Sequence, residues 1–194
     1  YEFELKIMKK VMDQYGIKEF LIIDPQGVIY NFGENDATEQ TMINPASPDK
    51  LSAITSFFLT SIVHPKGDII YFQYDSEAPY FVRLSQSFHI SKVYAHSQDA
   101  CPAPSTNMNY TQPILNLSKI LDGKYLNRIY SSRSDLSIDF NSRASNDGDE
   151  YKRVLNNISI YQKSVLVEKV ELSYIRNEQR FFLNKVLFNG DKSQ

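Results

Sequence analysis

Residues 19–33 read EFLIIDPQGVIYNFG, with an apolar run on each side of Asp-Pro-Gln-Gly. Pro25 presets φ at the first central position of a tight turn, and the flanking Asp and Gly suit the other positions. The sequence therefore predicts a β-hairpin built from residues 20–24 and 28–32.

Helices are predicted on both sides of this hairpin. In residues 1–15, Leu5, Met8 and Met12 recur at the spacings of three and four that are typical of one helix face. Gly16 follows where a helix often ends. Similar spacing predicts three more helices, at residues 47–63, 114–126 and 146–158. Alternating apolar and polar residues predict strands at residues 69–75, 80–88, 90–97, 127–132, 136–141, 164–175 and 180–188.

Residues 98–113 are rich in Pro, Ser and Asn, which indicates a boundary between two modules or one long loop. Each half of the chain reads helix, hairpin, loop, helix, hairpin. This order indicates an internal repeat, or the chance alternation of short elements that many α+β proteins show. The expected organisation is a helix at 1–15, modules at 16–97 and 114–194, and a linker at 98–113.

Composition excludes several classes of protein. The 194 residues carry 21 basic and 23 acidic side chains, a net charge of −2, which argues against a nucleic-acid partner. The single cysteine, Cys101, cannot form an internal disulfide. No apolar run reaches the length of a membrane-spanning helix. The chain begins with Tyr inside a periodic segment, so we expect it to be an excised part of a longer protein.

No catalytic or cofactor motif is recognisable. The three histidines, His64, His89 and His96, lack metal-ligand spacing, and glycine-rich phosphate loops are missing from a chain with only 7 glycines. The acidic residues at 146–150 lack the spaced oxygen ligands of a calcium loop. We therefore expect no enzyme activity in this segment, no metal and no cofactor.

The strand–Asp–Pro–x–Gly–strand unit at residues 20–33, with a helix before it and a helix and hairpin after it, resembles extracytoplasmic Per-Arnt-Sim-like sensor domains of the PDC or Cache family. The resemblance implies an α+β fold, in which an N-terminal helix precedes two PAS-like modules, each an antiparallel sheet with flanking helices. It also implies the periplasmic part of a membrane-anchored bacterial receptor, such as a histidine kinase or diguanylate cyclase, that dimerises in its full-length form.

Candidate ligand-binding residues lie on the strands of the first module. Tyr71 and Gln73 share a face by the period of two, and Arg83 on the next strand can meet them. Tyr94 and His96 share a face of the following strand in the same way. These side chains either line a ligand pocket or form the solvent face of an antiparallel sheet.

Three functions follow from these observations. The first is a sensor domain that binds a small ligand or a periplasmic partner and transmits the signal across the membrane. The second is a protein-interaction or dimerisation domain without a small-molecule pocket, with Tyr80, Phe81, Phe181 and Phe182 as interface anchors. The third, an enzyme of unfamiliar type, has no clustered acid, base or nucleophile to support it.

Overall fold

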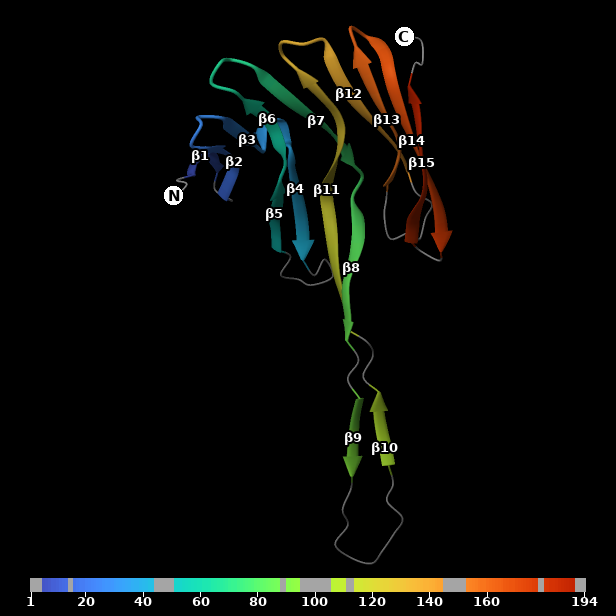
Figure 1. The fold of residues 1–194 in the computed structure, drawn as a ribbon. Helices are drawn as coiled ribbons and strands as arrows, with labels where there is room; N and C mark the ends of the chain where they lie inside the picture. The colour runs from blue at the N-terminus through green and yellow to red at the C-terminus, as the bar shows by residue number, and fades with distance from the viewer. Residues whose placement is uncertain are drawn as a thin grey trace, which may run out of the picture.

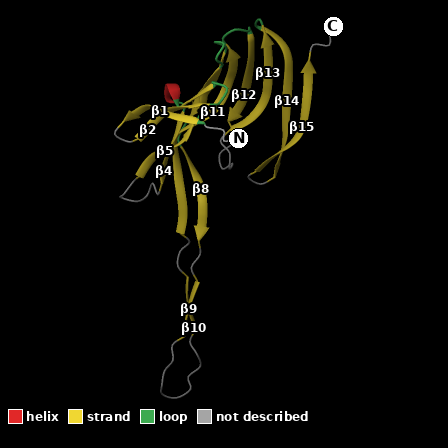
Figure 2. Cartoon of the chain, turned by 60° about the vertical axis from the view of Figure 1, so that its left-hand side comes forward, coloured by secondary structure: helices red, strands yellow, loops and turns green. Residues whose placement is uncertain are grey.

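The computed structural model describes residues 5–13, 16–43, 51–87, 90–94, 106–110, 114–144, 153–177 and 180–190. These residues form strands and a single short 3₁₀ turn, η1 (Glu34–Asp36), drawn in red in Figure 2. The strands are β1 (Lys6–Asp13), β2 (Gly16–Ile23), β3 (Ile29–Phe32), β4 (Thr38–Ile43), β5 (Leu51–Phe57), β6 (Leu59–Val63), β7 (Ile69–Glu77), β8 (Tyr80–Ser87), β9 (Ile90–Tyr94), β10 (Thr106–Tyr110), β11 (Ile114–Ser131), β12 (Leu136–Ala144), β13 (Arg153–Gln162), β14 (Val165–Asn177) and β15 (Arg180–Gly190).

Ten strands follow one another across a single antiparallel sheet, in the order β1-β2-β3-β6-β7-β11-β12-β13-β14-β15. Figure 1 shows this path as one curved layer that runs from β1 and β2 at one side to β14 and β15 at the other. β4, β5 and β8 branch off the path and lie below it in that view, and β9 and β10 form a separate two-stranded ribbon.

The predicted hairpin of the opening stretch is confirmed. β2 pairs with β3, and the Gly27 amide donates to the Asp24 carbonyl oxygen at 2.9 Å. The Asp24 carboxylate also accepts hydrogen bonds from the amides of Gln26 and Val28, each at 2.9 Å. The Asp side chain therefore holds the turn in the way that the sequence indicated.

The expected α+β fold is wrong, because the described chain is an antiparallel sheet without an α-helix. The N-terminal helix is replaced by β1, which pairs with β2. The predicted resemblance to PAS-like or Cache domains is also wrong, because the described residues contain none of the flanking helices. Each of the other predicted helices also contains strand: β5 and β6 in 51–63, β11 in 114–126, and β13 in 153–158.

β-bulges explain why these strands looked like helices. A bulged residue has no partner across the ladder, so apolar residues three apart come to lie on the same face. Asn156 is such a residue: Leu155 pairs with Ser142 and Asn157 with Asn141. The helix-like spacing of Leu155 and Ile158 is therefore the period of two with one residue added.

The same bulge recurs in four strands, each of which pairs antiparallel with an earlier strand of the chain: β6 with β3, β11 with β7, β13 with β12 and β15 with β14. In each case a Leu is followed by an unpaired Thr or Asn, one polar residue and then Ile or Val. The four tetrapeptides are LTSI (59–62) in β6, LNRI (126–129) in β11, LNNI (155–158) in β13 and LNKV (183–186) in β15. The chain thus repeats a bulged antiparallel strand pair, a repeat that differs from the helix–hairpin repeat predicted from the sequence.

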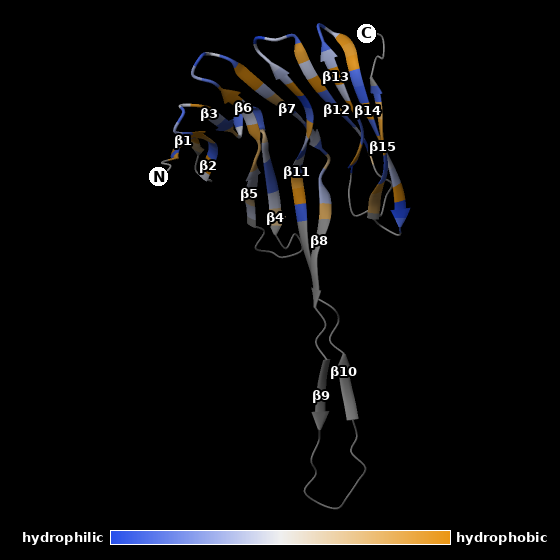
Figure 3. Ribbon diagram, viewed as in Figure 1, coloured by the Kyte–Doolittle hydropathy of each residue, from blue (hydrophilic) through white to orange (hydrophobic). Residues whose placement is uncertain are grey.

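The long sheet has one apolar and one polar face, because cross-strand partners share a face and neighbours along a strand alternate. Figure 3 shows the alternation as orange and blue segments along the strands. The apolar face comprises Phe20, Ile22, Tyr30, Phe32, Ile62, Phe72, Ile129, Ile138, Phe140, Ile158, Ile160 and Val170. The polar face comprises Asn31, Ser61, Tyr71, Gln73, Arg128, Tyr130, Ser137, Asp139, Asn157, Ser159, Lys169 and Glu171.

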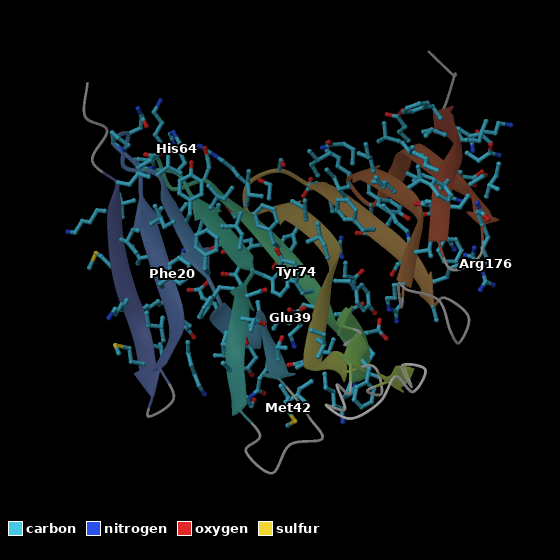
Figure 4. All side chains as sticks on the ribbon, turned by 90° about the horizontal axis from the view of Figure 1, so that it is seen from below. Phe20, Glu39, Met42, His64, Tyr74 and Arg176 are labelled. Carbon is cyan, nitrogen blue, oxygen red and sulfur yellow. The ribbon has the colours of Figure 1, made fainter. Side chains whose placement is uncertain are left out.

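Few apolar side chains are fully buried. Within the described part of the chain, the buried apolar residues are Ala37, Ile120 and Val154. An aromatic cluster covers one end of the apolar face: Phe20 stacks on Phe32 at 4.8 Å between ring centroids and meets Phe57 edge-on at 5.3 Å. Figure 4 shows Phe20 at one side of the molecule and Arg176, on β14, at the other. Most of the apolar face is therefore only half-buried.

β11 joins strands from both halves of the chain. Its residues 123–131 pair with β7, and its residues 114–120 pair with β8. Its opposite edge pairs with β4 and β12. The expected division into two modules stays a prediction, and most of the proposed linker lies outside the described residues. No described helix is long and apolar enough to span a membrane.

Candidate functional site

The structure places Tyr71 and Gln73 in one groove on the polar face of the sheet. The two residues alternate along β7 and pair with Tyr130 and Arg128 of β11, so the predicted shared face is confirmed. The groove has a volume of about 550 Å³, and η1 lies along its rim. We call it the central groove; its lining includes Glu34, Asn35, Thr60, Tyr71, Gln73, Asp75, Ser76, Lys124, Asn127 and Tyr130.

Glu34 is held in place at the rim by partners on each carboxylate oxygen. Lys10 from β1 forms an ion pair with Oε1, and the hydroxyl of Thr60 donates to Oε2 at 3.0 Å. The hydrogen bond to Glu34 raises the pKa of Lys10. Thr60 is the bulged residue of β6 and is only 7% exposed, so the bulge aims a polar side chain at this rim.

Lys124 forms a buried cationic corner of the central groove. Its side chain is 7% exposed, and its ammonium group lies 2.8 Å from Asp122 Oδ2 and 2.8 Å from Ser76 Oγ. Because Ser76 accepts this hydrogen bond, its own hydroxyl proton is directed elsewhere. Ser76 and Lys124 also line an adjoining hollow of about 900 Å³.

Two tyrosines form an aromatic wall. The rings of Tyr71 and Tyr130 stack across the strands, with centroids 5.0 Å apart and planes 23° apart. The Arg128 guanidinium lies 5.9 Å from the Tyr130 ring and forms an ion pair with Asp139 at 3.2 Å. This guanidinium is therefore engaged with the sheet itself and does not act as a free anion site.

Two amides remain available for a ligand. The side chains of Gln73 and Asn127 form no hydrogen bond with other described residues, although both line the central groove. Each amide offers a donor and an acceptor. Lys124 is paired to Asp122 and Glu34 to Lys10, which leaves Asp75 as the charged residue of the lining without an ion pair among the described residues. The arrangement therefore suits a neutral or cationic polar ligand better than an anion.

The other predicted site residues do not join this groove. Arg83 lies in β8 and pairs through its backbone with Leu117. Leu117 is eleven positions along β11 from Arg128, the partner of Gln73, a separation of about 35 Å in an extended strand. Tyr94 lies in β9, in the separate ribbon, and His96 lies outside the described residues.

Sequence reasoning missed most residues of the groove. Glu34, Thr60, Lys124 and Asn127 come from three elements that are far apart in the chain, η1, β6 and β11, and none belongs to a recognised motif. A signal was present for two of them, because Thr60 and Asn127 occupy the second position of the repeated tetrapeptides. Within the described residues, no group of three or more His, Cys, Asp or Glu side chains could hold a metal ion.

A second candidate surface is the last strand pair, β14 with β15, which we call the terminal hairpin. On the apolar side Phe188, Val186 and Leu183 continue the sheet face beside Val170, Leu172 and Tyr174. On the opposite side Ile175 lies directly across from Phe182, and the two are 55% and 53% exposed. The terminal hairpin therefore exposes apolar side chains on both faces: a continuous row on one face, and the Ile175–Phe182 pair beyond the polar residues Glu171, Ser173 and Lys185 on the other.

Comparison with known proteins supports the fold and leaves the function open. No protein-family model matches the sequence, and no curated protein matches it. The solved structures that are similar in fold include the N-terminal domain of effector protein SpvB from Salmonella typhimurium strain LT2, with a TM-score of 0.53 and 11% sequence identity. The similarity covers 99% of this chain and 67% of the SpvB chain, and at this identity it shows a shared fold alone.

Proposed function

We propose that this chain is a protein-interaction domain that docks another polypeptide through the terminal hairpin. The observation that carries the proposal is the exposure of apolar side chains on both faces of this hairpin. Contiguous exposed apolar patches commonly mark interaction sites.

Aromatic side chains supply the anchors that such an interface uses. Of the four anchors predicted from the sequence, Phe81 and Phe182 are 59% and 53% exposed, and Tyr80 and Phe181 are half-buried. Phe188, which the sequence prediction left out, is 69% exposed. Phe182 and Phe188 lie on opposite faces of β15, so a partner that contacts both would cover the hairpin from two sides.

The sensing role expected from the sequence rested on a helix-flanked PAS-like fold, and that basis is removed. A periplasmic location, a membrane-anchored parent and a homodimeric receptor stay predictions. The interaction role needs none of these, because it follows from the surface of the terminal hairpin.

Site-specific photo-crosslinking in the full-length protein, in the cells that make it, tests the proposal. A benzophenone amino acid would replace Phe182 or Phe188 and, as a control, Arg133. Arg133 is exposed but lies in the turn between β11 and β12 beside its ion-pair partner Asp68. We expect a discrete crosslinked polypeptide from the two hairpin positions and none from the control. Crosslinks at all three positions, or at none, would show that the hairpin is not a docking surface.

Small-ligand binding in the central groove is a second candidate function, favoured by the unpartnered amides of Gln73 and Asn127. A ligand that binds the native state raises the unfolding midpoint by mass action. A thermal-shift screen of neutral and charged metabolites should find a compound whose effect disappears in Gln73→Ala. The effect should persist in Gln162→Ala, an exposed glutamine at the end of β13. Equal loss of the thermal shift in both variants would show that the compound does not bind in the central groove.

A further inference from the structure

The two ends of the ten-strand path differ in how their edges are protected. β1 carries Lys6, Lys9 and Lys10, and charged residues of this kind discourage an edge strand from pairing with another chain. β15 occupies the other end and pairs with β14; no other described strand contacts it. Between residues 181 and 189 its single charged side chain is Lys185. The β15 edge therefore lacks the protection that β1 has.

β15 is also the fourth in a series of strands with the same bulged tetrapeptide. The other three, β6, β11 and β13, each pair on one side with an earlier strand, which is β3, β7 or β12. On their outer side they pair with the strand that follows them in the chain, which is β7, β12 or β14. β15 thus has the same bulge as three strands whose outer edges each pair with a further strand.

The three occupied edges share one register. The fourth residue of the tetrapeptide pairs outward with a β-branched apolar residue in every case. These pairs are Ile62 with Ile70, Ile129 with Ile138, and Ile158 with Val170. The third residue pairs outward with a polar one: Ser61 with Tyr71, Arg128 with Asp139, and Asn157 with Glu171. Where the third residue is cationic, as in Arg128, its outward partner is a carboxylate at 3.2 Å.

The occupying strands consequently read alike. Ile70-Tyr71-Phe72, Ile138-Asp139-Phe140 and Val170-Glu171-Leu172 each place an apolar residue, a polar residue and a large apolar residue in succession. The first and third residues of each triplet lie on the apolar face, where they extend the row of apolar side chains from strand to strand. In β15 the corresponding positions are Lys185 and Val186.

We infer that the β15 edge binds an antiparallel β-strand that reads Ile/Val–Asp/Glu–Phe/Leu, contributed by a partner polypeptide. Its β-branched residue pairs with Val186 and its acidic residue pairs with Lys185. This inference rests on the proposed interaction function and names how the terminal hairpin recognises its partner. Main-chain hydrogen bonds supply affinity in this mode of binding, and the alternate side chains supply specificity.

A peptide with the sequence of residues 135–144, DLSIDFNSRA, carries this pattern and serves as the probe. A second peptide carries D139K, which reverses the charge expected to face Lys185. Amide hydrogen exchange of the intact chain, followed by NMR with each peptide, locates the contact and gives its Kd. We expect the first peptide to slow exchange along β15. We expect the D139K peptide to bind about two- to five-fold more weakly, since cross-strand charge pairs contribute at this level.

Lys185→Glu provides the matched control in the protein. Because Lys185 is exposed, this variant should fold normally, and its preference for the two peptides should be inverted. The inference is overturned by protection that maps to β1, by equal affinity for both peptides in both proteins, or by no protection at about 1 mM peptide. If β15 fails in this way while Phe182 and Phe188 still crosslink, the hairpin docks by its faces and strand addition is wrong. If both experiments fail, the proposed interaction function is wrong as well.

Discussion

Gly33 shows how a single residue enables the bend between β3 and β4. Its φ is +83°, and an added Cβ would lie 2.3 Å from the Lys18 carbonyl oxygen and 3.2 Å from the Phe57 ring. Both the positive φ and the lack of room for a Cβ atom therefore require glycine at this position. Asn35 and Asp36 also have positive φ. Both lie in η1, at the rim of the central groove.

Gly33→Ala should destabilise the protein more than Gly67→Ala. Gly67 also has positive φ, at +89°, but nothing lies within 4 Å of an added Cβ. Its substitution should cost about 1 kcal/mol of unfolding free energy, and that of Gly33 about 3 kcal/mol, because the β2 backbone must also move. Chemical denaturation of both variants measures the difference. Equal costs would show that the close approach to Lys18 is relieved without strain.

Glu171 provides a prediction about pH. A hydrogen bond from Lys169, at 2.8 Å, lowers the pKa of the Glu171 carboxyl. A lowered folded-state pKa stabilises the protein above the unfolded pKa, and this stabilisation is lost as the pH falls through the folded pKa. The loss of this stabilisation is therefore confined to acid, from the ordinary carboxyl pKa downward.

NMR titration of the Glu171 side chain in the wild type and in Lys169→Met tests this prediction. We expect the pKa of Glu171 to rise toward its ordinary value in the variant. An unchanged pKa would assign the shift to the other hydrogen-bond partner, Asn189. Because this pair is solvent-exposed, the accompanying change in stability should be small.

At the scale of the element, the bulge decides which residues share a face. In β13 the bulged Asn156 separates Leu155, which pairs with Ser142, from Asn157, which pairs with Asn141. The Asn156 amide oxygen accepts a hydrogen bond from Arg143 at 3.0 Å. The extra residue lets Leu155 and Ile158 lie on the apolar face while the two asparagines between them point the other way.

Deletion of Asn156 should therefore be far more damaging than its substitution. Removing one residue shifts the strand by one position and turns the side chains beyond it to the wrong face. Asn156→Ala keeps the residue count and loses one hydrogen bond, at a cost of about 1 kcal/mol. Circular dichroism and thermal unfolding would compare the two variants. A deletion variant as stable as Asn156→Ala would mean that β13 does not need the bulge.

The repeated bulge explains part of the wrong prediction of helices, although the strand at 180–188 contains the same bulge and was predicted correctly. In the strands predicted at 69–75 and 164–175 the alternation remained readable: β7 has no bulged residue of its own, and the bulged Val167 of β14 lies near the start of its strand. The segments at 47–63, 114–126 and 146–158 lead into or contain the tetrapeptides, where apolar residues stand three apart. A period of three is closer to that of a helix than to that of a strand.

At the scale of the whole molecule, Arg153 connects the later strands to the first half of the chain. Its Nε lies 2.5 Å from Glu77 Oε2 at the end of β7, and its guanidinium lies 4.0 Å from the centroid of the Tyr125 ring in β11. The Arg153 and Glu77 side chains are 29% and 20% exposed, so water screens this pair only partly. The contact is one of few that span non-neighbouring strands of a sheet with little buried core.

Arg153→Met should lower the free energy of unfolding by about 1–2 kcal/mol, because it removes a partly buried ion pair and a cation–π contact. Arg133→Met is the control. The Arg133–Asp68 pair has the same chemistry at 2.8 Å, but its side chains are 74% and 43% exposed. Its loss should change stability by about 0.5 kcal/mol or less. Equal effects in denaturant unfolding would show that Arg153 does not hold the two parts of the sheet together.

The sequence by itself determined the local features of this protein. The Asp-Pro-Gln-Gly turn, most of the unbulged strands, and the shared face of Tyr71 and Gln73 all depend on neighbours within a few residues, which the chain order displays. Only the tertiary structure decided the fold class, the bulges and the rest of the groove. A bulge is defined by the partner strand, and Glu34, Thr60, Lys124 and Asn127 meet because separate hairpins pair edge to edge. The unprotected edge of β15 is likewise a property of the assembled sheet, since no strand in isolation shows which of its edges is covered.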